Sequence, residues 1–167
     1  LPTISRRQRQ MCIRDSAIAV LENNRVLNIF DMPVMSEGKK NKRQLNSALL
    51  VNLIKENIDR NEEVAVVVEQ VNAMPGQGVT SMFNFGQTFG AIKGVCAALE
   101  LPIFFVRPSK WKKHFELINS SKDSSRTKAI EMYPKLSNQL AKKKDVNKSD
   151  AILIARFFSE TRLTEEN

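Results

Sequence analysis

A continuous run of small and β-branched residues, VAVVV at positions 64–68, constrains the fold of this chain more than any other feature. Such a run lacks the alternation of a strand that faces water on one side, so it predicts a strand buried on both faces of an α/β sheet. Glu69 follows it directly. Ligands of open α/β sheets bind in the crevice at the carboxyl ends of such strands, where an unpaired buried carboxylate would be costly. We therefore predict that Glu69 is a site residue with a cationic partner; the alternative is a solvated glutamate at the end of a strand.

Hydrophobic periodicity predicts the elements around this strand. Two apolar runs, at 17–21 and 25–30, flank a polar turn and predict a hairpin, and residues 32–42 read as a loop. Residues 103–106 predict another strand, and helical spacing predicts helices over 45–58, 81–99, 108–115, 124–133 and 147–158. Strands that alternate with helices after an initial hairpin predict an α/β fold of three layers, with a mixed central sheet flanked by helices.

The composition fits one globular domain. A chain of 167 residues that is 42% hydrophobic can bury a core without disulfides. Cys12 and Cys96 match neither a disulfide framework nor a zinc-ligand spacing, which favours a cytoplasmic location. No apolar run reaches the ~18–20 residues of a membrane span and no signal-peptide pattern is visible, so we expect no membrane partner.

The excess of positive charge lies in one segment. Residues 107–148 contain twelve Lys or Arg and four Asp or Glu, a net charge of +8, which equals the formal net charge of the whole chain. The segment also holds the aromatic residues Trp111, Phe115 and Tyr133 together with His114. Basic residues mixed with aromatics favour a nucleic-acid backbone as the partner. The alternative is that runs such as 142–144 are simply solvated loops.

Two further carboxylates can join Glu69. Asp150 precedes the apolar sequence AILIA, which must dock on the sheet, so its side chain can reach the strand ends; Asp145 lies just before this helix. Hard carboxylates that converge suit Mg²⁺, and paired metals of this type activate water for phosphodiester cleavage. Alternatively, Asp150 is only a favourable residue near the start of a helix.

Four segments, in this order, carry a family resemblance: VVVEQV, MPGQGVTSMFNFGQTFG, LPIFFVRPSKWKKHF and KKDVNKSDAILIA. Together they resemble the RuvC-like Holliday-junction resolvases of the ribonuclease-H-like superfamily, and the resemblance covers residues 17–158. It implies a homodimeric endonuclease that depends on Mg²⁺ or Mn²⁺ and nicks four-way DNA junctions symmetrically during recombination and repair.

The resemblance also implies two groups of site residues. Glu69 and Asp150 match the family's acidic residues, Asp145 is a further candidate for catalysis and metal binding, and Asn147 is a weaker metal ligand. The basic residues implied to contact DNA are Arg107, Lys110, Lys112, Lys113 and Lys122. Each lysine has the alternative of being an ordinary solvated side chain.

Phe83 and Phe85 are expected in the core or in a dimer interface. The row Gly86, Gly90 and Gly94 predicts close packing, either on the sheet or on a partner subunit.

The beginning of the chain departs from the family pattern. Residues 1–16, LPTISRRQRQMCIRDS, contain four arginines and no apolar periodicity, and we interpret them as a non-native segment to be left out of the fold. The alternative is a basic disordered arm that binds nucleic acid. Family members begin with a strand that bears Gly-x-Asp-Pro-Gly, whose aspartate would fall at Met11, while Asp15 is out of register.

We therefore predict a nuclease domain over residues 17–160, with a tail at 161–167, that lacks its inner strand and one main metal ligand. Such a chain should bind DNA but cleave it weakly or not at all. Two other classes stay open, a catalytically inactive structure-specific DNA-binding protein and a ribonuclease-H-like nuclease that acts on RNA–DNA hybrids or flaps.

Overall fold

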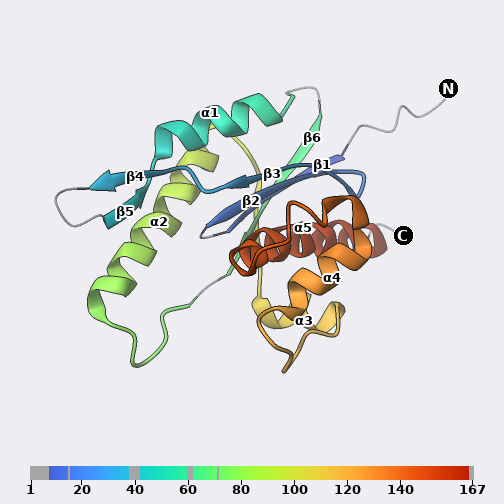
Figure 1. Ribbon diagram of the computed structural model, residues 1–167. Helices are drawn as coiled ribbons and strands as arrows, with labels where there is room; N and C mark the ends of the chain where they lie inside the picture. Colours follow the sequence, from blue (N-terminus) through green and yellow to red (C-terminus); the bar gives the residue numbers. More distant parts are fainter. Residues whose placement is uncertain (1–7, 15, 38–41, 60–61, 71, 166–167) are drawn as a thin grey trace.

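A five-stranded mixed sheet forms the centre of the molecule (Figure 1). The computed structural model describes residues 8–14, 16–37, 42–59, 62–70 and 72–165. The strand order is β3-β2-β1-β6-β7, in which β1 pairs antiparallel with β2 and parallel with β6. A separate antiparallel pair joins β4, which lies in the segment predicted as a loop, to β5, which runs from the last residue of that segment into the beginning of the predicted helix. The strands are β1 (Gln8–Arg14), β2 (Ala17–Glu22), β3 (Arg25–Asp31), β4 (Val34–Glu37), β5 (Lys42–Leu45), β6 (Glu63–Glu69) and β7 (Ile103–Val106).

Helices cover both faces of the sheet, which confirms the three-layer architecture (Figure 1). Alternation along the strands separates two cores: Cys12 and Val67 pack with α5 on one face, whereas Met11 and Val66 pack with α1 and α2 on the other. The helices are α1 (Ser47–Asn57), α2 (Val79–Ala98), α3 (Pro108–His114), α4 (Ser124–Met132) and α5 (Val146–Glu165), with short 3₁₀ turns η2 (Pro134–Leu136) and η3 (Lys143–Asp145).

Local sequence signals account for several boundaries. The Asn46 side chain accepts a hydrogen bond from the backbone N–H of Leu49 at 3.1 Å and so caps α1. Asn23 and Asn24 have φ angles of 47° and 64°, which suits the two-residue turn between β2 and β3. Helix α5 continues to Glu165, into the segment predicted as a tail. Among the described helices, none is long and apolar enough to cross a membrane.

The position of β1 corrects a prediction. Gln8–Arg14 was predicted to lie outside the fold, leaving the inner strand absent, but this segment is the central strand of the sheet. The physical reason is that Met11, Cys12 and Ile13 give both faces of one short strand apolar side chains, and all three are fully buried between β2 and β6. Whether residues 1–16 are non-native in origin stays a prediction, and residues 1–7 and 15 lie outside the described residues.

Candidate functional site

Three elements bring charged side chains together at the carboxyl end of β1 and β6. The parallel register pairs Ile13 with Val68, so the next residues, Arg14 and Glu69, end their strands at the same level. Because side chains alternate along a strand, both lie on the face of Cys12 and Val67, which packs against α5. Asp150, in the second turn of α5, approaches from that layer. The fold thus places an arginine and two carboxylates at one edge of the sheet.

The guanidinium of Arg14 bridges the two carboxylates. Its Nε donates to Oε2 of Glu69 at 2.9 Å, and its Nη1 donates to Oδ2 of Asp150. The other oxygen of Glu69, Oε1, accepts a hydrogen bond from Nε1 of Trp111 at 2.9 Å. Glu69 and Asp150 are only 6% and 7% exposed, so these contacts replace most of their hydration. Glu69 therefore has the cationic partner that its position requires, and that partner is Arg14.

The other two predicted metal ligands, Asp145 and Asn147, have different surroundings from those of Glu69 and Asp150. The Asp145 carboxylate is buried, but its Oδ2 accepts the backbone N–H of Lys142 at 2.9 Å and its Oδ1 lies 3.5 Å from Nζ of Lys148. These contacts stabilise the η3 turn before α5. Asn147 instead lines the cavity beside Asp150. Their predicted roles in catalysis and metal binding stay predictions.

A cavity of about 420 Å³ opens beside Arg14 and Asp150, which both line it. Of the predicted DNA contacts, Lys112 and Lys122 line it, whereas Arg107, Lys110 and Lys113 lie outside its wall. Lys112 Nζ is 5.6 Å from the ring centroid of Trp111, which places its charge over the indole. The full lining is Arg14, Trp111, Lys112, Leu117, Ser120, Ser121, Lys122, Ser125, Val146, Asn147 and Asp150. Sequence reasoning missed Arg14 and the three serines; the position of Arg14 one residue after an apolar triplet was the available signal.

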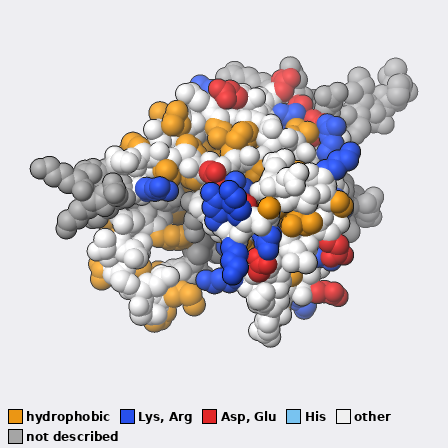
Figure 2. Space-filling view, in the orientation of Figure 1, with side chains coloured by type: hydrophobic (Ala, Val, Ile, Leu, Met, Phe, Trp, Pro, Cys, Tyr) orange, Lys and Arg blue, Asp and Glu red, His pale blue; other side chains and the backbone are white. Residues whose placement is uncertain are grey.

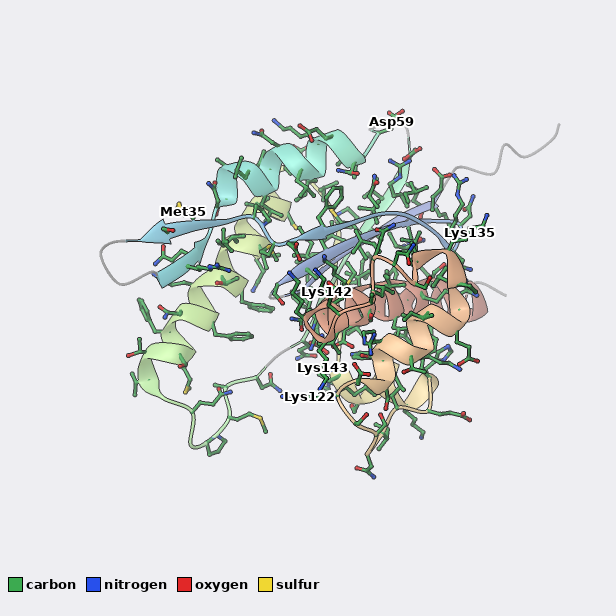
Figure 3. The ribbon with its side chains drawn as sticks, in the orientation of Figure 1. Met35, Asp59, Lys122, Lys135, Lys142 and Lys143 are labelled. Carbon is green, nitrogen blue, oxygen red and sulfur yellow. The ribbon has the colours of Figure 1, made fainter. Side chains whose placement is uncertain are left out.

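A basic surface, defined here as Lys122, Lys142 and Lys143, adjoins the cavity. All three lysines are exposed, and Figure 3 shows them one below the other near the beginning of α5. In Figure 2 a group of Lys and Arg side chains lies at the same place, in the middle of the visible face, while others lie nearer its edges. The positive charge that the sequence assigns to residues 107–148 is therefore partly concentrated beside the acidic pair.

Comparison with protein-family models and with curated proteins found no match. Among solved structures, the chain is similar to Thermus thermophilus RuvC in complex with a Holliday junction substrate, with a TM-score of 0.53 and 12% identity over 93% of this chain and 96% of that chain. A second structure of Thermus thermophilus RuvC gives a TM-score of 0.50 and 15% identity at the same coverage. This chain has the fold of RuvC. The predicted ribonuclease-H-like class, with its mixed sheet between helices, is confirmed.

Within this RuvC fold, the position expected for the family's first aspartate needs correction. Counting along the sequence placed it at Met11, but Met11 is fully buried and packs in the core beneath α1 and α2. Its side chain therefore faces away from Glu69 and α5. The residue level with Glu69 on the α5 face is Arg14.

The described residues do not fit the predicted Mg²⁺ or Mn²⁺ ion. Such ions bind carboxylate oxygens, but the guanidinium of Arg14 already bridges Glu69 and Asp150, and the other oxygen of Glu69 accepts a hydrogen bond from Trp111. In the part of the chain that the structure describes, no three His, Cys, Asp or Glu residues are grouped so that they could hold a metal. The metal requirement therefore stays a prediction, and no reaction step is derived through a metal.

The amino-terminal half of α2 has an exposed apolar surface. Val79 and Phe83 are 85% and 64% exposed, so Phe83 is not a core residue; Phe85 is half-buried. A Cβ atom built on Gly86 or Gly90 would meet nothing within 4 Å among the described residues. These glycines therefore do not serve close packing on the sheet of the same chain, which leaves the alternative of a partner subunit.

Proposed function

We propose that this chain represents a RuvC-like endonuclease that resolves four-way DNA junctions by phosphodiester hydrolysis in recombination and repair, and that the chain as it stands binds junctions but cleaves them weakly or not at all. The observation that carries the proposal is the cavity at the carboxyl end of β1 and β6, where Lys112 and Lys122 adjoin Asp150. It supports the proposal because a similar fold has been solved with a Holliday junction substrate.

The charges around the cavity suit a DNA backbone. Lys112 and Lys122 on its wall and the neighbouring basic surface offer several ammonium groups within one region. Each phosphate that such a group neutralises releases condensed counterions, so the logarithm of the affinity should fall with the logarithm of salt concentration by about 0.9 per phosphate in duplex DNA. Binding should therefore weaken steeply as salt rises.

The contacts of Arg14 support the impaired cleavage. An attacking water must approach a carboxylate oxygen within hydrogen-bond reach, so donors that already contact that oxygen compete with the water for it. Glu69 already accepts hydrogen bonds at both oxygens, from Arg14 and Trp111, and Asp150 accepts one from Arg14. The two buried carboxylates are thus engaged within the protein.

The exposed apolar surface of α2 supports the predicted homodimer. Val79, Met82 and Phe83 are exposed, and the glycine row leaves the helix backbone open to close approach. A second copy of this chain would cover apolar side chains that water otherwise contacts. Phe83→Asp should then shift the mass measured by light scattering after size-exclusion chromatography from dimer to monomer.

One binding and cleavage experiment tests the DNA function. Labelled four-way junction, linear duplex and RNA–DNA hybrid would be compared by gel shift in EDTA and on a denaturing gel with Mg²⁺. We expect the junction to bind more tightly than the duplex and to be nicked weakly or not at all.

Variants of the cavity lysines provide the matched comparison. Lys112→Gln with Lys122→Gln should weaken junction binding and reduce the salt dependence by about one per lysine contact with a phosphate. Lys135→Gln is the control, because this lysine belongs to the same basic segment but lies away from the basic surface in Figure 3. Equal affinity for all three nucleic acids would refute the junction function, and preference for the hybrid would favour the second nuclease class.

A further inference from the structure

We infer that Arg14 is an internal counter-ion whose guanidinium stands where a cation would otherwise join Glu69 and Asp150. The inference rests on the proposed function only for the role of the site toward DNA. The charge balance among Arg14, Glu69 and Asp150 follows from their contacts alone. In such a chain a covalently attached cation already balances half of the charge of the acidic pair, so the folded protein gains little from Mg²⁺ or Mn²⁺.

The first step is the occupancy of the carboxylate oxygens. Arg14 donates to one oxygen of Glu69 and to one of Asp150, while Trp111 donates to the second oxygen of Glu69. Three of the four carboxylate oxygens therefore have donors within the chain. A divalent ion would have to displace the guanidinium to reach both carboxylates.

The second step is charge. Two buried carboxylates without a partner would carry a charge of −2 in a region of low exposure, which is strongly unfavourable. The guanidinium brings the cluster to −1. It is planar, remains protonated and has donors spaced to serve two acceptors at once, so it can take the place of a small cation.

The identity of residue 14 therefore decides whether the acidic pair can take up a metal. Arg14→Gln removes the guanidinium without adding a charge and leaves Glu69 and Asp150 to repel each other. Arg14→Asp places a third carboxylate at the same strand end. Both variants should gain a divalent cation as a stabilising partner, and the second should gain more because three hard oxygen ligands converge.

Trp111 provides a direct reporter. It is the single tryptophan of the chain, and its indole N–H lies 2.9 Å from Oε1 of Glu69. Paramagnetic Mn²⁺ bound at Glu69 should therefore quench its fluorescence. The experiment is a Mn²⁺ titration of the full chain and the two variants, read by Trp111 fluorescence and by the melting temperature from circular dichroism.

We expect the parent chain to show neither saturable quenching nor a rise in melting temperature. Arg14→Asp should bind Mn²⁺ at least about tenfold more tightly, a ratio that corresponds to ~1.4 kcal/mol. Arg14→Gln should melt at a lower temperature and recover on adding Mn²⁺, which keeps the test valid even if Arg14→Asp does not fold.

Arg9→Gln is the matched control. Arg9 lies on the same strand and also bridges two carboxylates, those of Glu22 and Glu62. Its loss should lower the melting temperature without Trp111 quenching by Mn²⁺. Saturable quenching of the parent chain as strong as that of Arg14→Asp, or no gain in Mn²⁺ response in either Arg14 variant, would overturn the inference. Junction binding by the parent chain in EDTA is measured separately. Its absence would refute the proposed function but would not affect the inference that Arg14 is a counter-ion.

Discussion

The two ends of β1 use the same ion-pair chemistry in opposite surroundings. Arg9 lies between Glu22 and Glu62, with N···O distances of 3.0 Å to each, and Arg14 lies between Glu69 and Asp150. The five-residue separation puts the two arginines on opposite faces of the sheet.

The cavities beside these arginines differ in the sign of the charge that predominates on their walls. Near Arg9, the charged residues on the cavity wall are Lys55, Asp59, Glu62 and Glu100, three acids and one base. Near Arg14, they are Arg14, Lys112, Lys122 and Asp150, three bases and one acid. An arginine between two carboxylates is therefore not a sign of function by itself. The charge that surrounds it decides whether a polyanion can approach.

The largest expected effect tests the strand that joins the two ends. Cys12 lies between Arg9 and Arg14, is fully buried, and burial together with the nearby Glu69 charge raises its thiol pKa. In a Cys96→Ser background, Cys12 should react with a thiol reagent at least about a thousandfold more slowly than in urea, because exposing a central strand requires extensive unfolding. Reaction at the rate of a free thiol in the native protein would show that β1 is not docked, and the comparison of its ends would fail.

The next largest expected effect is on stability, and it distinguishes the surroundings of the two arginines. Arg14→Ala and Arg9→Ala should each lower the free energy of unfolding by about 3 kcal/mol, since each leaves two poorly exposed carboxylates without their shared cation. Urea unfolding followed by circular dichroism measures both losses. Only Arg14→Ala should shift the emission of folded Trp111, because that indole contacts the same glutamate. A shift in both variants would mean that the ends of β1 are not independent.

The sequence predicted much of this comparison but not the strand that carries it. The run at 64–68 was enough for β6, and the apolar sequence after Asp150 was enough for α5, because each pattern is local. β1 was missed since only Met11, Cys12 and Ile13 are apolar in it, and its burial depends on pairing with β2 and β6. Without β1, the partner of Glu69 could be predicted as a cation but not as Arg14.

The site shows the same limit on a smaller scale. The meeting of Glu69 and Asp150 was predictable, because the apolar sequence after Asp150 must dock on the sheet and can then bring its side chain to the strand ends. The hydrogen bond from the Lys142 backbone to Asp145 was not, since it depends on a single 3₁₀ turn. Likewise, the positive charge of the basic segment was clear, but which lysines line the cavity depends on how α3 and α4 pack.

A smaller effect sharpens the contrast in charge between the cavities. Asp59→Lys with Glu100→Lys would change the sign of the wall near Arg9 while leaving the Arg14 cavity intact. We expect affinity for linear duplex to rise a few-fold, with a salt slope steeper by about one or two. Because this cavity lies away from the acidic pair at Arg14, the preference for a junction over a duplex should not increase. Gel shifts at several salt concentrations would measure both quantities, and an increased junction preference would contradict the assignment of junction binding to the Arg14 side.

The smallest expected effect comes from a more exposed ion network on the α5 side of the sheet. Although partial burial opposes it, hydrogen bonds from His114 and Arg156 lower the pKa of Glu160 below its ordinary value. The folded state therefore favours the carboxylate, so the stabilisation is present above the ordinary pKa of about 4.5 and is lost as pH falls through the lowered value. Since Glu160 is 29% exposed, the loss should stay below about 1 kcal/mol. Urea unfolding of the parent chain and Glu160→Gln at pH 6 and pH 3 would measure it, and the difference between the two proteins should shrink at pH 3. If that difference persisted unchanged at pH 3, packing of the side chain and not its charge would stabilise this end of α5, and the ion pairs buried at Arg9 and Arg14 would be the stronger class by contrast.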